Sequence, residues 1–182
     1  MCQYSVEAED GVPTDWHLAH LGGKAAGGFG LVIAEATAVT AQGRISNRDT
    51  GLWDDAQRDA WAPIVAFIQA QGAAAGVQLA HAGAKAGAYG WLPQFRDAGQ
   101  VGSIPLDDGG WTTVSPSGKA IGGLAAPQRL TTEQIRASID DWVAAARRAD
   151  QAGFDVVQLH MAHGYLVHQF LSPLSNDRDD EW

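Results

Sequence analysis

Three stretches of the chain share a pattern of nearly unbroken apolar residues that ends in polar side chains. They occupy residues 28–39, 74–83 and 153–164, with the sequences GFGLVIAEATAV, AAGVQLAHAG and GFDVVQLHMAHG. Continuous apolarity is typical of parallel strands that are covered on both faces, whereas a half-exposed strand alternates. We therefore predict three buried parallel strands.

Helical spacing of apolar residues precedes each of these strands. The clearest helix begins after Thr131, which has Gln134 at the spacing of a capping box. Its apolar stripe consists of Ile135, Ile139, Trp142, Val143, Ala146 and Ala149. Two more helices are predicted over about residues 14–26 and 55–71, and we expect Pro63 to kink or break the second of these.

The alternation of helix and strand predicts an α/β fold with a parallel sheet. Polar residues follow the carboxyl ends of the strands, where barrels and open doubly wound sheets hold their active sites. No G-x-G-x-x-G motif opens a helix after a strand, which disfavours a dinucleotide-binding sheet. We therefore predict a (β/α)8 TIM barrel, here an incomplete N-terminal half with about strands 1 to 4. Only three strands and a remnant at residues 1–4 are recognisable, which is fewer than the eight of a full barrel.

Residues 84–130 are rich in glycine and proline and show no clear period. They follow the second predicted strand, on the side of the sheet where the active site is expected. A segment of this length in a compact domain is usually a lid or a binding subdomain. We predict that residues 1–182 form one partial barrel domain in which residues 84–130 are a long active-site loop.

Composition narrows the classes of function. The formal net charge is −9, with 12 Lys and Arg against 21 Asp and Glu, and there is no basic run. This charge argues against nucleic acid and anionic membrane surfaces as partners. No apolar stretch reaches the roughly 18 to 20 residues of a membrane span, no leader resembles a signal peptide, and Cys2 is the single cysteine. We predict a soluble cytoplasmic protein without internal disulfides.

The third strand ends in a cluster of hydrogen-bonding groups formed by His160, His163 and Tyr165. Two histidines three residues apart are able to share a metal ion, and catalytic zinc normally has three protein ligands. A metal-dependent hydrolase barrel would recruit His81 and Glu35 from the neighbouring strand ends. The residues alone leave three possibilities open: a metal site, a packed histidine pair, or a group of hydrogen-bond donors that acts on a substrate.

Five motifs, in this order along the chain, resemble the Old Yellow Enzyme family of FMN-dependent ene-reductases, specifically its thermophilic-like bacterial class. They are MCQYS at 1–5, EATAV at 35–39, QLAHAG-x-KA at 78–86, HMAHGYL at 160–166 and FLSPLSNDRDD at 170–180. Each lies at or near a predicted strand end, apart from the last. The resemblance implies a (β/α)8 barrel that binds FMN and takes hydride from NADPH or NADH.

The same resemblance implies roles for individual residues. In this family the two histidines, here His160 and His163, donate hydrogen bonds to the carbonyl or nitro oxygen of an activated alkene, and Tyr165 gives the proton. The resemblance implies no metal site. The complete protein is expected to be a homo-oligomer that acts on small molecules. The positions that resemble flavin-binding residues are Met1, Cys2, Ala36 and Gln78, and Tyr4 resembles a substrate-contacting tyrosine.

The chain departs from the family pattern in places. Ala84 replaces a usual arginine and Trp182 a usual tyrosine, while Lys85 matches a family lysine that is as readily a solvated surface residue. Family members continue beyond Trp182 with the half of the barrel that binds the FMN phosphate, so we expect this chain alone to bind FMN weakly or not at all. A non-catalytic fragment that pairs with another chain through its open sheet edge is the remaining alternative.

Overall fold

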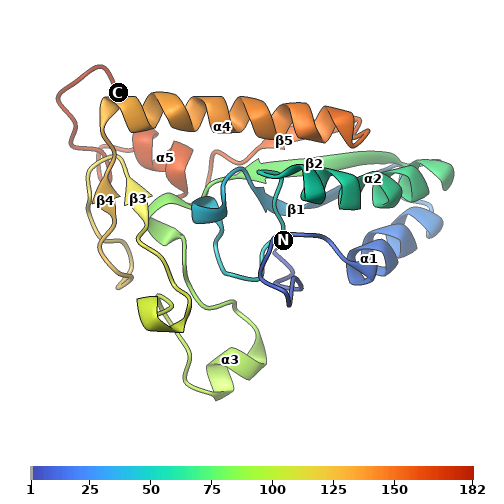
Figure 1. The fold of residues 1–182 in the computed structure, drawn as a ribbon, viewed down its shortest axis with the longest axis horizontal. Coiled ribbons are helices and arrows are strands. Elements are labelled where there is room, and N and C mark those ends of the chain that lie inside the picture. Colours follow the sequence, from blue (N-terminus) through green and yellow to red (C-terminus); the bar gives the residue numbers. More distant parts are fainter. Residues whose placement is uncertain (1) are drawn as a thin grey trace.

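A three-stranded parallel sheet in the order β1-β2-β5 forms the centre of the computed structural model, which describes residues 2–182 (Figure 1). The strands are β1 (Leu31–Ala38), β2 (Ala74–Ala80) and β5 (Val156–Leu159). β2 lies in the middle and pairs with β1 from Ala74 to Ala80 and with β5 from Gly76 to Leu79. The three predicted parallel strands are therefore confirmed.

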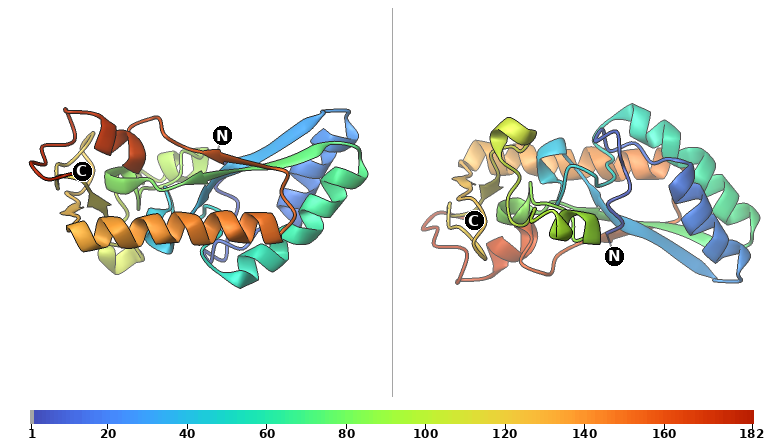
Figure 2. Two further views of the ribbon diagram at one scale, coloured as in Figure 1. Left: turned by 90° about the horizontal axis from the view of Figure 1, so that it is seen from above. Right: turned by 90° about the horizontal axis from the view of Figure 1, so that it is seen from below.

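Three long helices lie on the same side of this sheet (Figure 2). They are α1 (Asp15–Ala26), α2 (Asp55–Ala70) and α4 (Thr132–Gln151). Between them and the sheet lies the main apolar core, in which the fully buried Trp61 contacts the edge of the Phe154 ring. None of the helices in residues 2–182 has the length and apolar content needed to cross a membrane.

The opposite face of the sheet and its β5 edge remain exposed. Ile33 in β1 is 40% exposed, and Val157 and Leu159 in β5 are 40% and 53% exposed. The prediction of burial on both faces holds for most of β2 and is wrong for β5. The reason is that all three long helices cover one face, and within residues 2–182 β5 has a partner strand on one edge only.

The ends of α4 follow the sequence prediction. The Thr131 hydroxyl accepts a hydrogen bond from the Gln134 N–H at 3.2 Å, and the Gln134 side chain accepts one from the Thr131 N–H at 2.9 Å. This is the predicted capping box. In α2, by contrast, Pro63 lies inside a continuous helix, so the alternative of a break there is wrong. Burial of Trp61 and Ile64 on either side of the proline stabilises the helix against the loss of one backbone hydrogen bond.

The predicted remnant of a first strand is not a strand in the described part, residues 2–4. The Gln3 N–H donates to the Glu35 carboxylate, where a ladder would need a backbone acceptor. Further along, the Val6 N–H donates to the Arg48 carbonyl at 3.1 Å. The segment is thus held to the end of β1 through a side chain.

The 84–130 segment contains short elements of its own, and it extends below the sheet in the view of Figure 1. The short 3₁₀ helix η1 (Ala41–Gly43) lies before this segment, and η2 (Gly83–Lys85) lies at its start. The segment then includes α3 (Pro93–Asp97), η3 (Leu106–Asp108), β3 (Val114–Ser115) and β4 (Gln128–Arg129). β3 and β4 pair with each other as a two-stranded sheet. The long loop that was predicted is therefore an ordered subdomain next to the carboxyl ends of β1 and β2.

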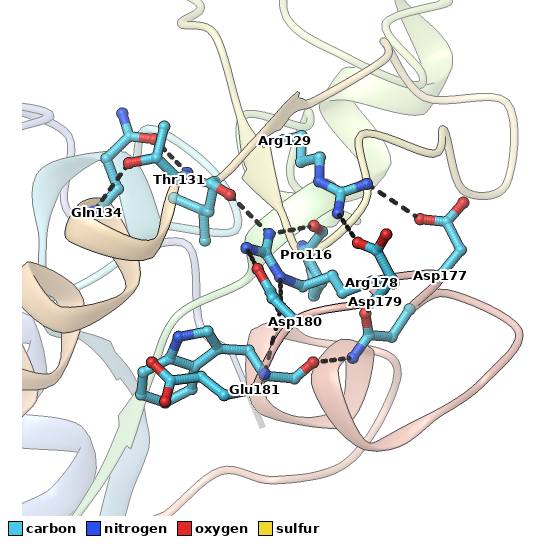
Figure 3. A network of polar contacts seen from close by, with 12 residues as sticks. Pro116, Arg129, Thr131, Gln134, Asp177, Arg178, Asp179, Asp180 and Glu181 are labelled. Atoms are coloured by element: carbon cyan, nitrogen blue, oxygen red, sulfur yellow. Dashed lines mark hydrogen bonds and ion pairs between the residues drawn. The ribbon is translucent and has the colours of Figure 1, made fainter.

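Arg178 connects this subdomain to the segment after α5 (Leu166–Leu171), as Figure 3 shows. Its side chain is 3% exposed and donates to the carbonyls of Pro116 and Leu130 at 2.9 and 2.7 Å. The same guanidinium donates hydrogen bonds to both carboxylate oxygens of Asp180. A planar donor group with five N–H bonds is suited to such a junction, because it satisfies carbonyls and a carboxylate at once.

Candidate active site

The carboxyl ends of the three strands bring small and polar residues side by side. Ala36 pairs with Gln78, and Gln78 pairs with Gln158, so the three residues form one row across the sheet. The Gln78 amide donates to the Gln158 side-chain oxygen at 2.8 Å. The partner of the Gln78 amide within the chain is thus another side chain, and the predicted contact of Gln78 with a flavin stays a prediction. The repeat of Gln-Leu at 78–79 and 158–159 was the sequence signal for Gln158.

A register shift in β1 sets the direction of Glu35. Between Ala34 and Ala36 the pairing with β2 skips one residue, which leaves Glu35 without a partner in the ladder. Such a bulge re-aims a side chain near the end of a strand. The Glu35 carboxylate lies 3.4 Å from Nε2 of the buried His17 and accepts from the Gln3 N–H. It therefore holds the segment that carries Cys2 and Tyr4.

His160 and His163 face each other directly after β5. The Nε2 atom of His160 lies 3.2 Å from Nδ1 of His163. His160 is 7% exposed, and its Nδ1 accepts from the Ala162 N–H at 3.2 Å, so its ring proton sits on Nε2 and points at His163. Burial and the neighbouring His163 lower the pKa of His160, which favours the neutral ring. The pair is a donor–acceptor contact between two imidazoles.

Tyr165 completes the cluster. Its ring centroid lies 4.8 Å from that of His160 and 6.3 Å from that of His163. Burial is the main cause of the raised pKa of Tyr165, with smaller contributions from Cys2 and Asp49. The phenol therefore keeps its proton throughout the neutral range, as an acid catalyst requires.

Four of the predicted site residues share one apolar cluster. Tyr165, Tyr4 and Cys2 pack against a small buried core that includes Ala36. Burial is the main cause that raises the pKa of the Cys2 thiol to about 12, so this cysteine is a neutral thiol. Burial likewise raises the pKa of Tyr4. The predicted Met1 lies outside the described residues.

The residues of the metal alternative have other partners. His81 is 4% exposed, and its Nδ1 accepts from the Gly83 N–H at 3.1 Å. Burial lowers the pKa of His81 to about 4. Glu35 is paired with His17, as described above. Within residues 2–182, no group of three or more His, Cys, Asp or Glu side chains is arranged to hold a metal ion.

Two residues near the histidine pair have contacts that the sequence did not indicate. The Lys85 ammonium donates to the His163 carbonyl at 2.7 Å and lies 5.9 Å from the centre of the Tyr165 ring. Lys85 is thus half-buried against the site, and the alternative of a solvated surface lysine is wrong. His168 in α5 accepts from the Gly164 N–H through Nδ1 at 2.7 Å.

Chemically, this end of the sheet offers two kinds of contact. The paired amides of Gln78 and Gln158 carry both donors and acceptors, which suits a flat heterocycle edge with alternating C=O and N–H groups. The small Ala36 next to them lets a ring approach the strand backbone. The histidine pair offers ring N–H donors to an oxygen, with the Tyr165 hydroxyl in the same cluster. Parallel strands, helices on one face and polar groups at the strand ends are the arrangement expected of part of a (β/α)8 barrel with its site at the carboxyl ends of the strands.

Comparisons with known proteins identify the family. The model of the NADH:flavin oxidoreductase / NADH oxidase family matches residues 1–182, and the chain belongs to this family. It is 47% identical over 182 residues to an NADPH dehydrogenase of Listeria innocua and 46% identical over 188 residues to an NADH:flavin oxidoreductase of Gibberella zeae. These alignments cover 100% of this chain and 48% and 43% of the relatives.

Solved structures confirm the fold class. Morphinone reductase superposes with a TM-score of 0.81 at 28% identity, and Old Yellow Enzyme from a Pichia species with 0.80 at 28%. Both superpositions cover 100% of this chain, and they cover 47% and 45% of the two solved chains. The resemblance to the Old Yellow Enzyme family and the partial (β/α)8 barrel are thereby confirmed. The chain spans about half the length of the curated relatives it matches.

Proposed function

We propose that this chain provides the substrate-polarising part of an FMN-dependent NAD(P)H oxidoreductase that reduces the activated C=C bond of α,β-unsaturated carbonyl or nitro compounds. The observation that carries the proposal is the facing pair of His160 and His163 beside Tyr165, at the carboxyl end of β5. Membership of the flavin oxidoreductase family supports the cofactor. A solved structure of morphinone reductase with tetrahydroNAD supports a nicotinamide as the reductant.

FMN, when bound, supplies the hydride that it has received from NADPH or NADH. Ala36, Gln78 and Cys2 would hold the flavin ring, and Met1, which is also predicted to bind it, lies outside the described residues. Gln158 extends the row of amides, because its side chain is already bonded to Gln78. Since the Cys2 thiol stays neutral, it would contact the ring without adding a charge.

His160 and His163 bind the oxygen of the substrate. Their facing nitrogen atoms are 3.2 Å apart. The two rings must therefore move apart before one oxygen can accept a hydrogen bond from each of them. His160 already presents its proton on Nε2. For the second bond, His163 must carry a proton on Nδ1. Two such donors withdraw electrons from the double bond and stabilise the enolate or nitronate oxygen that develops after hydride addition.

Tyr165 then gives a proton to the carbon next to the polarised group. Its raised pKa keeps the proton available at neutral pH, and the developing carbanion is basic enough to take it. Tyr4, which packs in the same cluster, contacts the substrate on the side of the 84–130 subdomain. Its side chain lies against Gly90, where an added Cβ would meet the Tyr4 ring carbons at 3.0 Å.

The proposal is tested in a chimera. In the Listeria innocua NADPH dehydrogenase, the segment matched by this chain is replaced by residues 1–182. We expect the chimera to bind FMN and to consume NADPH in the presence of 2-cyclohexenone under anaerobic conditions. A chimera that holds FMN and oxidises NADPH with oxygen, yet gives no enone-dependent turnover, contradicts the proposed substrate class.

The unmodified chain provides a second comparison. We expect residues 1–182 alone to leave the visible spectrum of added FMN unchanged. Stoichiometric FMN that stays with the chain through gel filtration contradicts this expectation. Zinc in stoichiometric amount without flavin contradicts the proposed function as a whole.

A further inference from the structure

The peptide bond between His163 and Gly164 is held from both of its polar sides. Its carbonyl oxygen, from His163, accepts from the Lys85 ammonium at 2.7 Å. Its N–H, from Gly164, donates to Nδ1 of His168 at 2.7 Å. In the described turn between His160 and Tyr165, this is the peptide whose carbonyl oxygen and N–H are both bonded to side chains.

This peptide needs such support because its backbone is in an unfavourable conformation. His163 has a φ of 57°, in the left-handed region that residues with a Cβ rarely adopt, and Gly164 follows with a φ of 70°. A Cβ at Gly164 would lie 3.0 Å from the Lys85 Nζ. Glycine at 164 therefore serves two purposes: it accepts the left-handed conformation and leaves room for the lysine.

Gln169 joins the turn that contains this peptide to the turn after β2. Its side chain is 1% exposed, and its amide donates to the carbonyls of Gly164 and Ala82 at 2.6 and 3.2 Å. Its side-chain oxygen accepts from the Ala84 N–H at 3.1 Å, next to Lys85. The turn after β2 and the turn after β5 are thus joined through a buried side chain. The backbone next to Lys85 is held in place by the same contact.

We propose that Lys85 and His168 are positioning residues for the substrate-binding histidine pair. By holding the His163–Gly164 peptide, they fix the direction in which the His163 ring leaves the backbone. Nδ1 of His163 then faces Nε2 of His160 at 3.2 Å, and the two rings are held next to each other before a substrate oxygen moves them apart. This inference rests on the proposed function for its catalytic meaning, whereas its structural part is independent of it.

The structural part is tested by NMR on residues 1–182. We expect Lys85→Met to speed hydrogen exchange of the Gly164 amide at least about tenfold relative to the parent, and to broaden or split the ring nitrogen signals of His163. Lys85→Arg, which keeps a cationic donor, restores most of both signals. Lys24→Met removes an exposed lysine in α1 and serves as the matched control that changes neither.

Outcomes are read only in variants whose far-UV circular dichroism matches the parent. Should Lys85→Met not fold, Lys85→Gln and His168→Ala provide the same comparison. Unchanged Gly164 exchange together with unchanged His163 ring signals in a folded variant overturns the inference.

The catalytic part is tested in the chimera described above. We expect Lys85→Met to lower kcat/KM for the enone about tenfold or more and Lys85→Arg to recover most of it, while Lys24→Met equals the parent. Altered NMR signals with undiminished enone turnover overturn the positioning role. A chimera without enone turnover even in the parent form contradicts the proposed function, and the NMR result then stands on its own as a structural finding.

Discussion

At the scale of single residues, burial favours the neutral forms of His160, Tyr165 and Cys2. Burial is the first cause of the lowered pKa of His160 and of the raised pKa values of Tyr165 and Cys2. Uncharged groups suit a site that polarises an oxygen by hydrogen bonds and then delivers one proton. The proposed roles of His160 and Tyr165 as hydrogen-bond donor and proton donor both need the neutral forms that burial favours.

Tyr165 provides a prediction at this scale. In the chimera, we expect Tyr165→Phe to lower enone turnover about 100-fold, because general acid catalysis typically contributes 10²–10⁴-fold. Phenylalanine keeps the packing against His160 and removes only the hydroxyl. The measurement is steady-state NADPH consumption with the enone. Turnover equal to the parent means that solvent supplies the proton and that Tyr165 has only a packing role.

His81 provides a second prediction. Its folded pKa of about 4 lies below the ordinary value of 6.5, so the unfolded chain takes up the proton first as the pH falls. The stabilisation by neutral His81 is complete above pH 6.5 and is lost between 6.5 and 4, with a magnitude of about 3 kcal/mol at most. His81→Asn keeps an acceptor for the Gly83 N–H and does not titrate.

Urea unfolding of parent and His81→Asn at several pH values measures this effect. We expect the free energy of unfolding to fall more steeply for the parent than for the variant as the pH is lowered. Parallel curves contradict a buried neutral imidazole at this position.

At the scale of secondary-structure elements, the sequence predicted the strands and helices from apolar periodicity and capping residues. The Thr131–Gln134 capping box and the parallel strands are examples, because both depend on local pattern. Exposure of β5 was not predictable in this way, since it depends on which elements cover a strand. The short elements inside the 84–130 segment were not predicted, because the segment lacks a period and is held by scattered polar contacts.

Arg178 makes two of those polar contacts, and its contribution to stability can be tested by substitution. Its truncation in Arg178→Ala leaves the Pro116 and Leu130 carbonyls without this donor. We expect a loss of about 1.5–3 kcal/mol in the free energy of unfolding, the usual range for hydrogen bonds to a charged group. Limited proteolysis within residues 117–127 should become faster at the same time.

Arg136→Ala is the matched control, because the Arg136–Glu181 pair has side chains that are 64% and 62% exposed. An exposed ion pair contributes about 0–1 kcal/mol. Equal effects of the two substitutions contradict the structural role assigned to Arg178.

The candidate site was predictable as far as residue type and strand position decide it. His160, His163, Tyr165, Tyr4 and Ala36 were predicted because each lies in a motif that resembles the family pattern, and their roles stay predictions. Glu35, Lys85 and His168 were assigned no such role, since their contacts depend on a bulge and on the left-handed backbone at His163. Neither feature has a signature in one sequence: a histidine with positive φ looks like any other histidine.

At the scale of the whole molecule, the described residues form a partial barrel in which three strands are covered by helices on one face. One face of the sheet and the β5 edge are exposed, and an apolar groove of about 640 Å³ lies between α4, β5 and α5. Known relatives are about twice as long as this chain. We infer that the flavin-dependent reaction needs more of a barrel than this partial one, which is why the chimera is the object of the activity tests.

The most direct test of the central claim separates the two halves of the reaction. The FMN of the chimera is reduced with NADPH under anaerobic conditions and mixed with 2-cyclohexenone in a stopped-flow instrument, and the return of flavin absorbance is followed. We predict that replacing both His160 and His163 by alanine slows this reoxidation about 100-fold or more, because one such donor typically contributes 10²–10³-fold. Reoxidation by the enone at the parent rate in the folded, flavin-loaded double variant contradicts the account.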